Sequence, residues 1–408
     1  MDPLMTTHAS PAFANLAEID TSALEDNYRF LRQLAPGSAE CVAVVKANAY
    51  GHGLSLCAPA AVRAGAHWLA VASVEEAIAA RAYAPQARIL ALGSILPGWG
   101  ATVIAHGITP CIWTLEHLDE LESAAHAAAL GPASLAVHLE IDTGMSRQGA
   151  ALEELPDILK RITPSSPLRI EAVMTHLYAS DEDNGARSAQ QYVKLDEALR
   201  MIQSTPAAAH LQYLSAGASA ALLGSDAADV AEMAQRFGLK PMFRLGLALY
   251  GIAPRSTDLQ APAAQLPGQP VLKPVLTWKT RVVSLRTIPA GTEIGYNGTF
   301  TATEPMRLAL IPTGYADGLD RRLSNRFSLL VRGQRAPLVG RVSMDMAVLD
   351  VTEIPGVETG DEVVILGTQN RGTQDNETIT AYDLADASET IPWEVFTSIG
   401  PRVPRISV

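Results

Sequence analysis

Cys41–Gly53 reads CVAVVKANAYGHG, and this stretch decides the fold that the rest of the chain is expected to adopt. Five small or β-branched apolar residues lead directly into Lys46. Because no polar residue alternates with them, they predict a strand that is buried on both faces, as in a parallel sheet. Lys46 stands where this strand ends. In a barrel of alternating strands and helices, the carboxyl ends of the strands carry the chemistry.

Lys46 has two interpretations. An amine at the end of an apolar strand is partly desolvated, which lowers its pKa and makes it a nucleophile toward carbonyl compounds, including pyridoxal phosphate. Alternatively, Lys46 only extends its ammonium group from the barrel mouth into water. The strand end by itself favours neither interpretation.

Apolar runs alternate with Ala-rich helical stretches through the first part of the chain. The alternation predicts an α/β fold that begins with an N-terminal (β/α)8 TIM-type barrel over residues 14–252. An open doubly wound sheet normally has a G-x-G-x-x-G turn after its first strand, and this chain has none. The eight expected strands are Val42–Val45, Trp68–Ala72, Arg88–Leu92, Thr109–Trp113, Leu135–Ile141, Ile170–Thr175, Leu211–Leu214 and Met242–Arg244.

The pattern changes after the barrel. Residues 253–274 are rich in Pro, Ala, Gln and Gly and predict a linker. Residues 275–408 contain short β-branched runs between Gly, Pro and Asp turns, which predict a mostly β C-terminal domain. A strand expected at Ala14–Ile19 leaves open whether residues 1–19 add to that domain.

Composition excludes several function classes. A net charge of −12 over 408 residues argues against nucleic-acid and membrane partners, and no apolar run reaches the length of a membrane span. The N-terminus lacks the basic start and apolar core of a signal peptide. The three cysteines and nine histidines follow no metal-ligand or disulfide spacing, so we expect no metal and a cytoplasmic location.

Polar residues follow the later barrel strands. Arg147, His176 and Ser219 come after the fifth, sixth and seventh strands, and Arg244 lies on the eighth. The loops after the last two strands of such barrels commonly bind phosphate, which places a phosphate next to a reactive lysine. Each residue also has a structural interpretation. Ser219 could be a helix N-cap, His176 a core histidine, and Arg244 an ion-paired barrel arginine.

Six motifs occur in order along the chain: AVVKANAYGHG, DTGMSRQG, FRLGLALYG, GYNGTF, GYADG and GRVSMDM. Together they resemble the motifs of the alanine racemases, the barrel-fold class of enzymes that use pyridoxal 5'-phosphate (PLP). The resemblance covers nearly the whole chain. It implies an isomerase that interconverts L-alanine and D-alanine and supplies D-alanine for peptidoglycan.

The resemblance also implies residue roles. Lys46 would hold PLP as a Schiff base and act as one catalytic base, with Tyr296 of the other subunit as the opposite-face base. His176 would hydrogen-bond Arg244, which would lie against the pyridine nitrogen and keep it unprotonated. Further cofactor contacts would be Tyr50, Ser219, Gly246, Leu247 and Trp393, the substrate contacts Arg147, Met344, Asp345 and Tyr315, and the substrate access path Asp181, Arg321, Arg341 and Ile391. Because Tyr296 and Met344 would come from the partner subunit, a homodimer with composite sites is implied.

Four positions depart from the family pattern. Glu140 stands where the family usually has a carbamylated lysine, and we expect its carboxylate to position Arg147 directly. The alternative is a barrel-interior glutamate paired with another base. Trp393 replaces a tyrosine near the phosphate, and its indole can donate but not accept a hydrogen bond. Ala218 and Leu245 replace a usual asparagine and proline.

Two other functions stay open. The first is a racemase of broader specificity, acting on serine or basic amino acids. It stays open because Trp393 and Glu140 differ from the residues that the family usually has near the substrate. The second is a non-catalytic PLP-binding protein built on a single barrel. Proteins of that kind lack a β domain, so residues 275–408 with Tyr296 argue against it.

Overall fold

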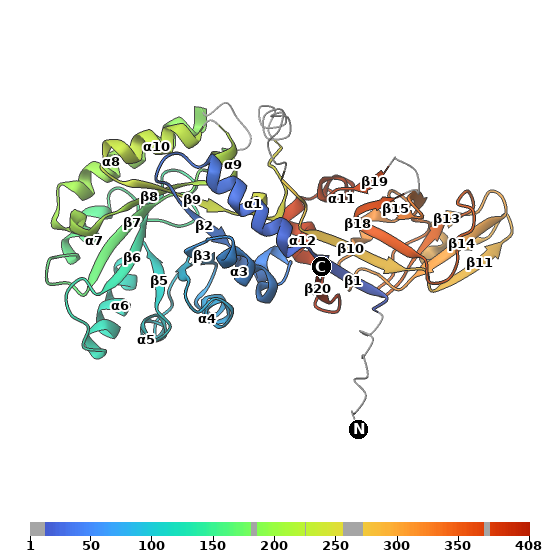
Figure 1. The fold of residues 1–408 in the computed structure, drawn as a ribbon, viewed down its shortest axis with the longest axis horizontal. Helices are drawn as coiled ribbons and strands as arrows, with labels where there is room; N and C mark the ends of the chain where they lie inside the picture. Colours follow the sequence, from blue (N-terminus) through green and yellow to red (C-terminus); the bar gives the residue numbers. More distant parts are fainter. Residues whose placement is uncertain (1–12, 181–185, 225, 256–271, 371–375) are drawn as a thin grey trace, which may run out of the picture. The chain divides into compact units, whose positions relative to one another are not determined.

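The computed structural model describes residues 13–180, 186–224, 226–255, 272–370 and 376–408. The chain divides into two compact units (Figure 1). Thr21–Val275 forms what we call the barrel unit, and Met1–Asp20 together with Leu276–Val408 forms the β unit.

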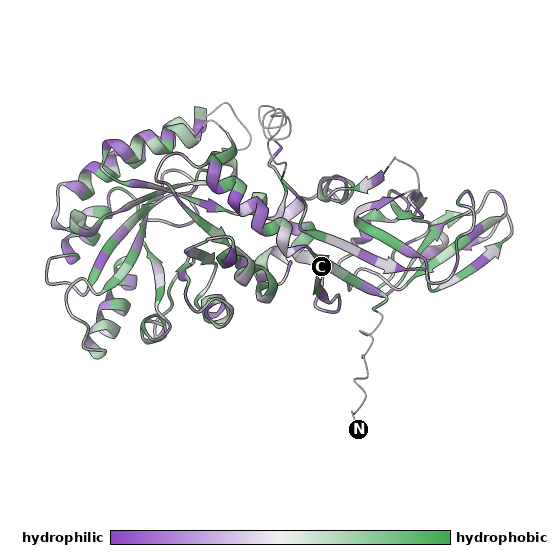
Figure 2. Cartoon of the chain, viewed as in Figure 1, coloured by the Kyte–Doolittle hydropathy of each residue, from purple (hydrophilic) through white to green (hydrophobic). Residues whose placement is uncertain are grey.

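The barrel unit contains a closed parallel barrel, which confirms the predicted (β/α)8 fold. Its strands pair in sequence order, and β9 closes the ring on β2. β3 is buried along its whole length and β2 from its second residue on, which explains why they appear in the sequence as continuous apolar runs. In Figure 2 the barrel strands show green, apolar segments interrupted by purple, hydrophilic ones. The strands are β2 (Glu40–Val44), β3 (Trp68–Val71), β4 (Arg88–Ala91), β5 (Ile108–Ile112), β6 (Leu135–Glu140), β7 (Leu168–Met174), β8 (Tyr213–Ala218) and β9 (Lys240–Leu245).

Helices connect the strands and begin at recognisable caps. The Ser73 and Thr114 side chains accept hydrogen bonds from backbone N–H groups in the first turns of α4 and α6. The helices are α1 (Thr21–Leu34), α2 (Lys46–Tyr50), α3 (Leu54–Arg63), α4 (Val74–Tyr83), α5 (Gly100–Ala105), α6 (Leu115–Ala127), α7 (Leu155–Arg161), α8 (Ala186–Gln203), η1 (Pro206–His210), α9 (Ser219–Leu223), α10 (Asp226–Arg236) and η2 (Leu247–Tyr250).

Strand β8 extends further than the sequence predicted. We expected it to end at Leu214, but it continues to Ala218, with an irregular register against β9 between Leu214 and Gly217. The small residues Ser215–Ala218 suggest a loop in the sequence. Their size has a packing reason, because a Cβ on Gly217 would come within 2.6 Å of the Phe243 ring.

The β unit contains a seven-stranded sheet, a three-stranded sheet and a two-stranded sheet. The strand expected near the N-terminus, β1 (Asn15–Ile19), pairs antiparallel with β10 (Leu276–Arg281) and parallel with β20 (Arg405–Ser407), so it lies in this unit and not in the barrel. The other elements are β11 (Ser284–Ile288), β12 (Glu293–Ile294), η3 (Tyr296–Gly298), β13 (Phe300–Thr301), β14 (Met306–Ile311), η4 (Arg321–Leu323), β15 (Ser328–Val331), β16 (Gln334–Pro337), β17 (Ala347–Asp350), β18 (Glu362–Asn370), β19 (Asn376–Ile379), α11 (Ala381–Ala387) and α12 (Pro392–Ser398).

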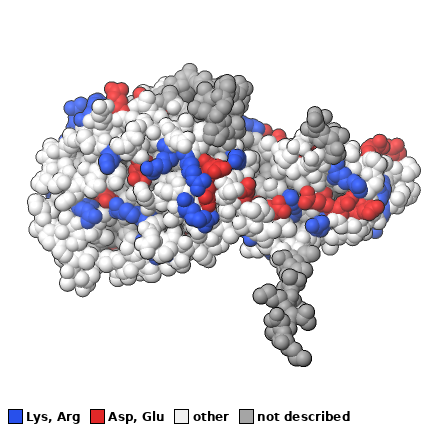
Figure 3. All heavy atoms as spheres, in the orientation of Figure 1, with Lys and Arg blue, Asp and Glu red and all other residues white. Residues whose placement is uncertain are grey.

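Most of the linker predicted at residues 253–274 lies outside the described residues. Within the described ranges, no helix combines the length and apolar character needed to cross a membrane. Acidic and basic side chains are interspersed on the face shown in Figure 3.

Candidate active site

Four of the predicted site residues lie at the carboxyl ends of barrel strands. Lys46 follows β2, His176 follows β7, Ser219 follows β8, and Arg244 is the penultimate residue of β9. Because the carboxyl ends of parallel strands meet at one rim, these residues share the mouth of the barrel.

Arg244 is held in place by hydrogen bonds from its guanidinium group to neighbouring strands. Its side chain is buried, and its guanidinium donates to the Ser215 carbonyl (2.6 Å), the Ser215 Oγ (2.6 Å), the Thr175 carbonyl (2.8 Å) and His176 Nδ1 (3.2 Å). An arginine only donates hydrogen bonds, so His176 Nδ1 accepts and the imidazole carries its proton on Nε2. The hydrogen bond that the family resemblance implied between these two residues is therefore present.

His176 is held in its neutral form. Burial lowers the pKa of its imidazole to about 3, and the positive charges of Arg244, Arg147 and Lys46 act in the same direction. A neutral histidine can orient Arg244 without adding charge to the site.

Lys46 lies in the same field of positive charge. Burial is the main cause that lowers the pKa of its ammonium group, followed by the charges of Arg147 and Arg244, and the Glu76 carboxylate opposes them. A lowered pKa increases the fraction of neutral amine, the form that attacks a carbonyl carbon. This favours the reactive interpretation of Lys46 over the solvated one.

Two hydroxyl groups lie next to the backbone at the end of β9. The Gly246 N–H donates to Ser219 Oγ (2.9 Å), and a Cβ on Gly246 would come within 2.8 Å of the Tyr50 hydroxyl. Burial raises the pKa of Tyr50 to about 12, so its hydroxyl stays protonated and can donate. Two hydroxyls and a backbone with no side chain in the way, next to the barrel-mouth cations, fit a phosphate group. Leu247 follows directly as the first residue of η2.

Glu140 is buried inside the barrel, at the end of β6. Its carboxylate accepts a hydrogen bond from Gln148 Nε2 (2.6 Å), and the same amide group donates to the Leu92 carbonyl (3.0 Å). Burial raises the pKa of Glu140, whereas the Gln148 hydrogen bond and the charges of Arg244 and Arg147 lower it. Glu140 thus interacts with Arg147 through charge, and its hydrogen bond within the described residues goes to Gln148. Its role in positioning Arg147 stays a prediction.

The β unit carries the other predicted residues on its loops. Tyr296, in η3, is 67% exposed, and Met344 is 53% exposed. Two backbone hydrogen bonds join the loop of Tyr315 to that of Met344, from Tyr315 N to the Ser343 carbonyl and from Ala316 N to the Met344 carbonyl (both 3.0 Å).

Arg402 fixes this pair of loops. Its guanidinium donates to Asp345 (2.7 Å) and to the buried carboxylate of Asp317 (2.9 Å). The Asp317 carboxylate also accepts from the Gly314 N–H (2.9 Å). Asp345, expected beside the substrate carboxylate, is therefore part of an ion-pair network in this structure.

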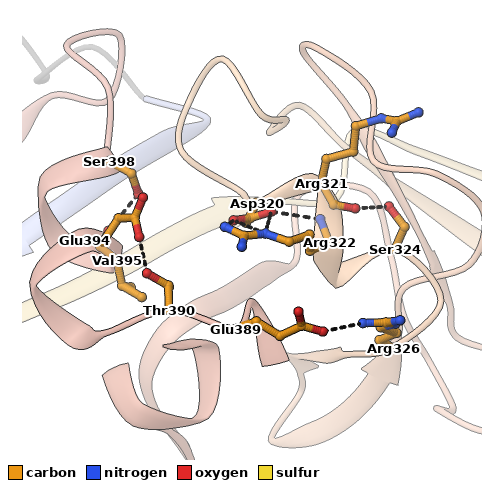
Figure 4. Close-up of polar contacts among 10 residues, drawn as sticks. All are labelled: Asp320, Arg321, Arg322, Ser324, Arg326, Glu389, Thr390, Glu394, Val395 and Ser398. Atoms are coloured by element: carbon orange, nitrogen blue, oxygen red, sulfur yellow. Dashed lines mark hydrogen bonds and ion pairs between the residues drawn. The ribbon is translucent and has the colours of Figure 1, made fainter. Parts of the chain in front are cut away.

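Three of the predicted access residues lie in the β unit, namely Arg321, Arg341 and Ile391. Tyr315 and Arg321 line a cavity of about 540 Å³, together with Trp278 and Glu394. Figure 4 shows that the Arg321 guanidinium points away from the other labelled side chains, while Asp320 pairs with Arg322 and Glu389 with Arg326. Ile391 is the N-cap residue of α12, Trp393 lies half-buried on the same helix, and Arg341 follows the Gly340 turn. Asp181 lies outside the described residues.

Several residues of the site could not be identified from the sequence. Thr175 and Ser215 hold Arg244, Gln148 holds Glu140, and Glu76 contacts the turn after Lys46. The only signal for Glu76 is its place three residues after Ser73, which indicates a helix start and not a site. Across the described ranges, no three His, Cys, Asp or Glu side chains gather closely enough to hold a metal ion.

The chain is similar to known proteins over nearly its full length. It is 36% identical to the alanine racemase of Halothermothrix orenii over 389 residues, which cover 95% of each chain. The solved alanine racemase of Bartonella henselae, with covalently bound pyridoxal phosphate, has a TM-score of 0.80 at 29% identity, over 97% of this chain and 100% of that one. That of Bacillus anthracis, with bound L-Ala-P, has a TM-score of 0.83 at 31% identity, over 98% and 96%.

Two family models account for both units. Residues 19–254 match the model described as alanine racemase, N-terminal domain, and residues 275–407 match alanine racemase, C-terminal domain. With the geometry of the barrel mouth, these matches give the assignment: the chain belongs to the alanine racemase family.

Proposed function

We propose that this protein is a PLP-dependent isomerase that interconverts L-alanine and D-alanine. The observation that carries the proposal is the cluster at the barrel mouth. Lys46 has a lowered pKa there, in the field of Arg244, which His176 and two strand ends hold in place. The relatives named alanine racemase share both units of the chain.

The residues at the barrel mouth fit PLP. Tyr50, Ser219 and the backbone of Gly246 and Leu247 would hold its phosphate, and Lys46 would hold its aldehyde carbon. Arg244 would face the ring nitrogen. When bound, PLP withdraws electrons from Cα of the amino acid and so weakens the bond to the α-proton.

Two side chains would move the proton. The neutral form of Lys46, favoured by its lowered pKa, would take or return the α-proton on one face of the substrate. The hydroxyl of Tyr296 would do the same on the opposite face. Racemisation follows because a proton removed from one face can be replaced from the other.

The substrate carboxylate would lie between Arg147 and the backbone N–H of Met344 of the partner subunit. Arg147 adds positive charge at the barrel mouth, where it lowers the pKa values of Lys46 and His176. Glu140 would balance part of that charge and set the position of Arg147. If Glu140→Gln left both KM and kcat unchanged, this role for Glu140 would be excluded.

The reaction can be tested by proton NMR in deuterium oxide. The purified protein with PLP is incubated with L-alanine, L-serine or L-lysine, and each product is resolved on a chiral column. We expect the α-proton signal of alanine to disappear first and the alanine to become racemic. Faster exchange of serine or lysine would replace the alanine assignment with a broader racemase. No exchange with any substrate would contradict the proposed activity.

We infer that two chains form a homodimer with composite sites, each combining one barrel unit with Tyr296 of the partner subunit. The exposure of Tyr296 and Met344 supports this, because their side chains are free to meet another surface. Lys46→Ala and Tyr296→Phe chains, each inactive alone, are mixed and allowed to exchange subunits. Composite sites predict recovered activity, since a hybrid dimer contains one site with both native residues. Sites formed within single chains predict none.

We also propose that the enzyme acts in the cytoplasm and supplies D-alanine for peptidoglycan. D-Alanine is the product that the proposed reaction makes from an abundant cellular amino acid. Deletion of the gene should therefore make growth depend on added D-alanine. Growth without D-alanine, in a strain with no second racemase, would contradict this role.

A further inference from the structure

The backbone that follows Lys46 is strained. Ala47, Asn48, Ala49 and Tyr50 all have positive φ angles, of 52°, 53°, 56° and 52°. Left-handed conformations are costly for residues that carry a Cβ, and a run of four persists only where the surroundings enforce it. The turn after Lys46 therefore needs specific contacts to hold it.

One carboxylate makes the contacts at the start of this turn. Glu76, in the first turn of α4, accepts a hydrogen bond from the Ala47 N–H on Oε1 (2.7 Å) and from the Ala72 N–H on Oε2 (2.7 Å). The last main-chain bond between the two neighbouring segments joins Val45 N to the Ala70 carbonyl (2.8 Å). Glu76 thus joins the end of β3 to the turn, just beyond the point where backbone pairing stops.

Other groups hold the far end of the turn. The Asn48 side chain accepts from the Leu54 N–H (2.8 Å), and His52 Nδ1 lies 2.9 Å from the Tyr50 carbonyl. These contacts fix the residues that lead into α3. At the end that carries Lys46, the Glu76 side chain contacts the backbone at Ala47.

Glu76 also acts on Lys46 through its charge. Burial, Arg147 and Arg244 lower the pKa of the Lys46 ammonium group, and the Glu76 carboxylate raises it. The same side chain therefore affects both the backbone next to Lys46 and the charge of its amine.

We propose that Glu76 is a positioning residue for Lys46. Its carboxylate fixes the peptide group between Lys46 and Ala47, and with it the direction in which the Lys46 side chain leaves the backbone. The inference deepens the proposed function, since it rests on Lys46 as the residue that holds PLP.

The test compares Glu76→Gln and Glu76→Asp with the control Glu75→Gln. Glu75 precedes Glu76 in the first turn of α4 and is exposed, so E75Q removes the same charge from the same turn. The E76Q amide can accept through only one atom, so one of the two backbone N–H groups loses its partner. E76D keeps the charge but is one methylene shorter.

Two readouts are measured besides activity. The first is the rate at which the visible absorbance of bound PLP is lost on dialysis. The second is the apparent pKa of Lys46 in the protein freed of PLP, from competitive acetylation over a pH series and mass spectrometry of the Lys46 peptide. The exposed Lys160 serves as internal reference.

We expect E76Q to lose PLP about tenfold faster than wild type, the effect of one hydrogen bond to a charged group. We also expect E76Q to lower the apparent pKa of Lys46, and E75Q to match wild type in both readouts. E76D should lose PLP faster while the pKa of Lys46 stays closer to wild type.

The inference is overturned if E76Q and E75Q behave alike, or if E76Q lowers the melting temperature but changes neither readout. A failure of the proposed function looks different. In that case wild-type protein reduced with borohydride would carry no PLP on Lys46, while the acetylation experiment would still report whether Glu76 acts on Lys46.

Discussion

Arg244 and Tyr296 show how differently the barrel unit and the β unit hold their site residues. Arg244 is 5% exposed, and the ends of neighbouring strands accept its hydrogen bonds. Tyr296 is 67% exposed in the short 3-10 helix η3. The barrel half of the site is therefore fixed by the fold of one unit. In the β half, Asp345 is held by Arg402, whereas the side chains of Tyr296 and Met344 are exposed and available to another surface.

The largest effect that this comparison predicts is on catalysis and not on stability. Tyr296 is largely exposed in the isolated chain, so Tyr296→Phe should change the unfolding free energy by less than about 0.5 kcal/mol. Loss of a general acid–base group should lower kcat about 10³-fold. Polarimetry of alanine racemisation and urea unfolding measure the two quantities.

The opposite result for Tyr296→Phe would contradict the distinction between a buried barrel half and an exposed β half of the site. A loss of stability with little loss of kcat would mean that the hydroxyl has a structural partner. The buried Tyr28 hydroxyl, which donates to the Cys41 carbonyl (3.0 Å), is the matched contrast. Tyr28→Phe should lower stability by about 1 kcal/mol.

The next effect is on the stability of the barrel unit. Arg244→Leu leaves the Thr175 and Ser215 carbonyls without their donor, and it should lower the unfolding free energy by about 3 kcal/mol. Arg321→Leu, at an exposed arginine of the β unit, is the control and should change it by less than about 0.5 kcal/mol. Equal losses in the two variants would contradict the distinction between a buried half and an exposed half.

The sequence predicted the barrel strands better than it predicted the side chains and carbonyl groups that hydrogen-bond to the site residues. Continuous apolar runs locate parallel strands because such strands are buried on both faces. They also locate Lys46, His176 and Arg244, since polar residues at strand ends face the barrel mouth. β8 was placed too short because its small residues Ser215–Ala218 carry little strand signal, and their packing against Phe243 depends on the neighbouring strand.

The supporting contacts could not be predicted for a related reason. Ser215 and Thr175 hold Arg244 mainly through backbone carbonyls, which any residue type provides. Glu76 reaches Ala47 across 29 positions of sequence, a proximity that only the closed barrel creates. In the β unit, the residues themselves were identified from motifs, but their exposure depends on how the loops fold.

A third prediction concerns Arg402, which pairs with Asp317 and Asp345 in the β unit. Arg402→Met removes the partner of Asp317, whose side chain is only 6% exposed, and should lower the unfolding free energy of the β unit. It should also raise KM for alanine more than it lowers kcat, because the loop of Met344 loses its anchor at Asp345. Arg322→Met breaks the more exposed pair with Asp320 and should lower the unfolding free energy less than Arg402→Met does. Similar effects of the two variants would show that the network around Arg402 does not organise the loop.

The smallest effect is a pH dependence that belongs to the barrel half. The folded-state pKa of His176 is lowered from 6.5 to about 3. Below pH 6.5 the unfolded chain therefore binds a proton that the folded chain does not, and stability falls as the pH decreases toward 3. A single such group changes the unfolding free energy by at most about 1.4 kcal/mol per pH unit.

His176→Asn keeps an acceptor for Arg244 and removes the titrating group, so its stability should fall less steeply between pH 6 and pH 5. The exposed His126 on α6 provides the control, since His126→Asn should keep the wild-type slope. Both variants retain the buried His138, whose pKa is also lowered, so the difference between their slopes isolates His176. Identical slopes in the two variants would mean that the imidazole next to Arg244 is not held neutral by the barrel.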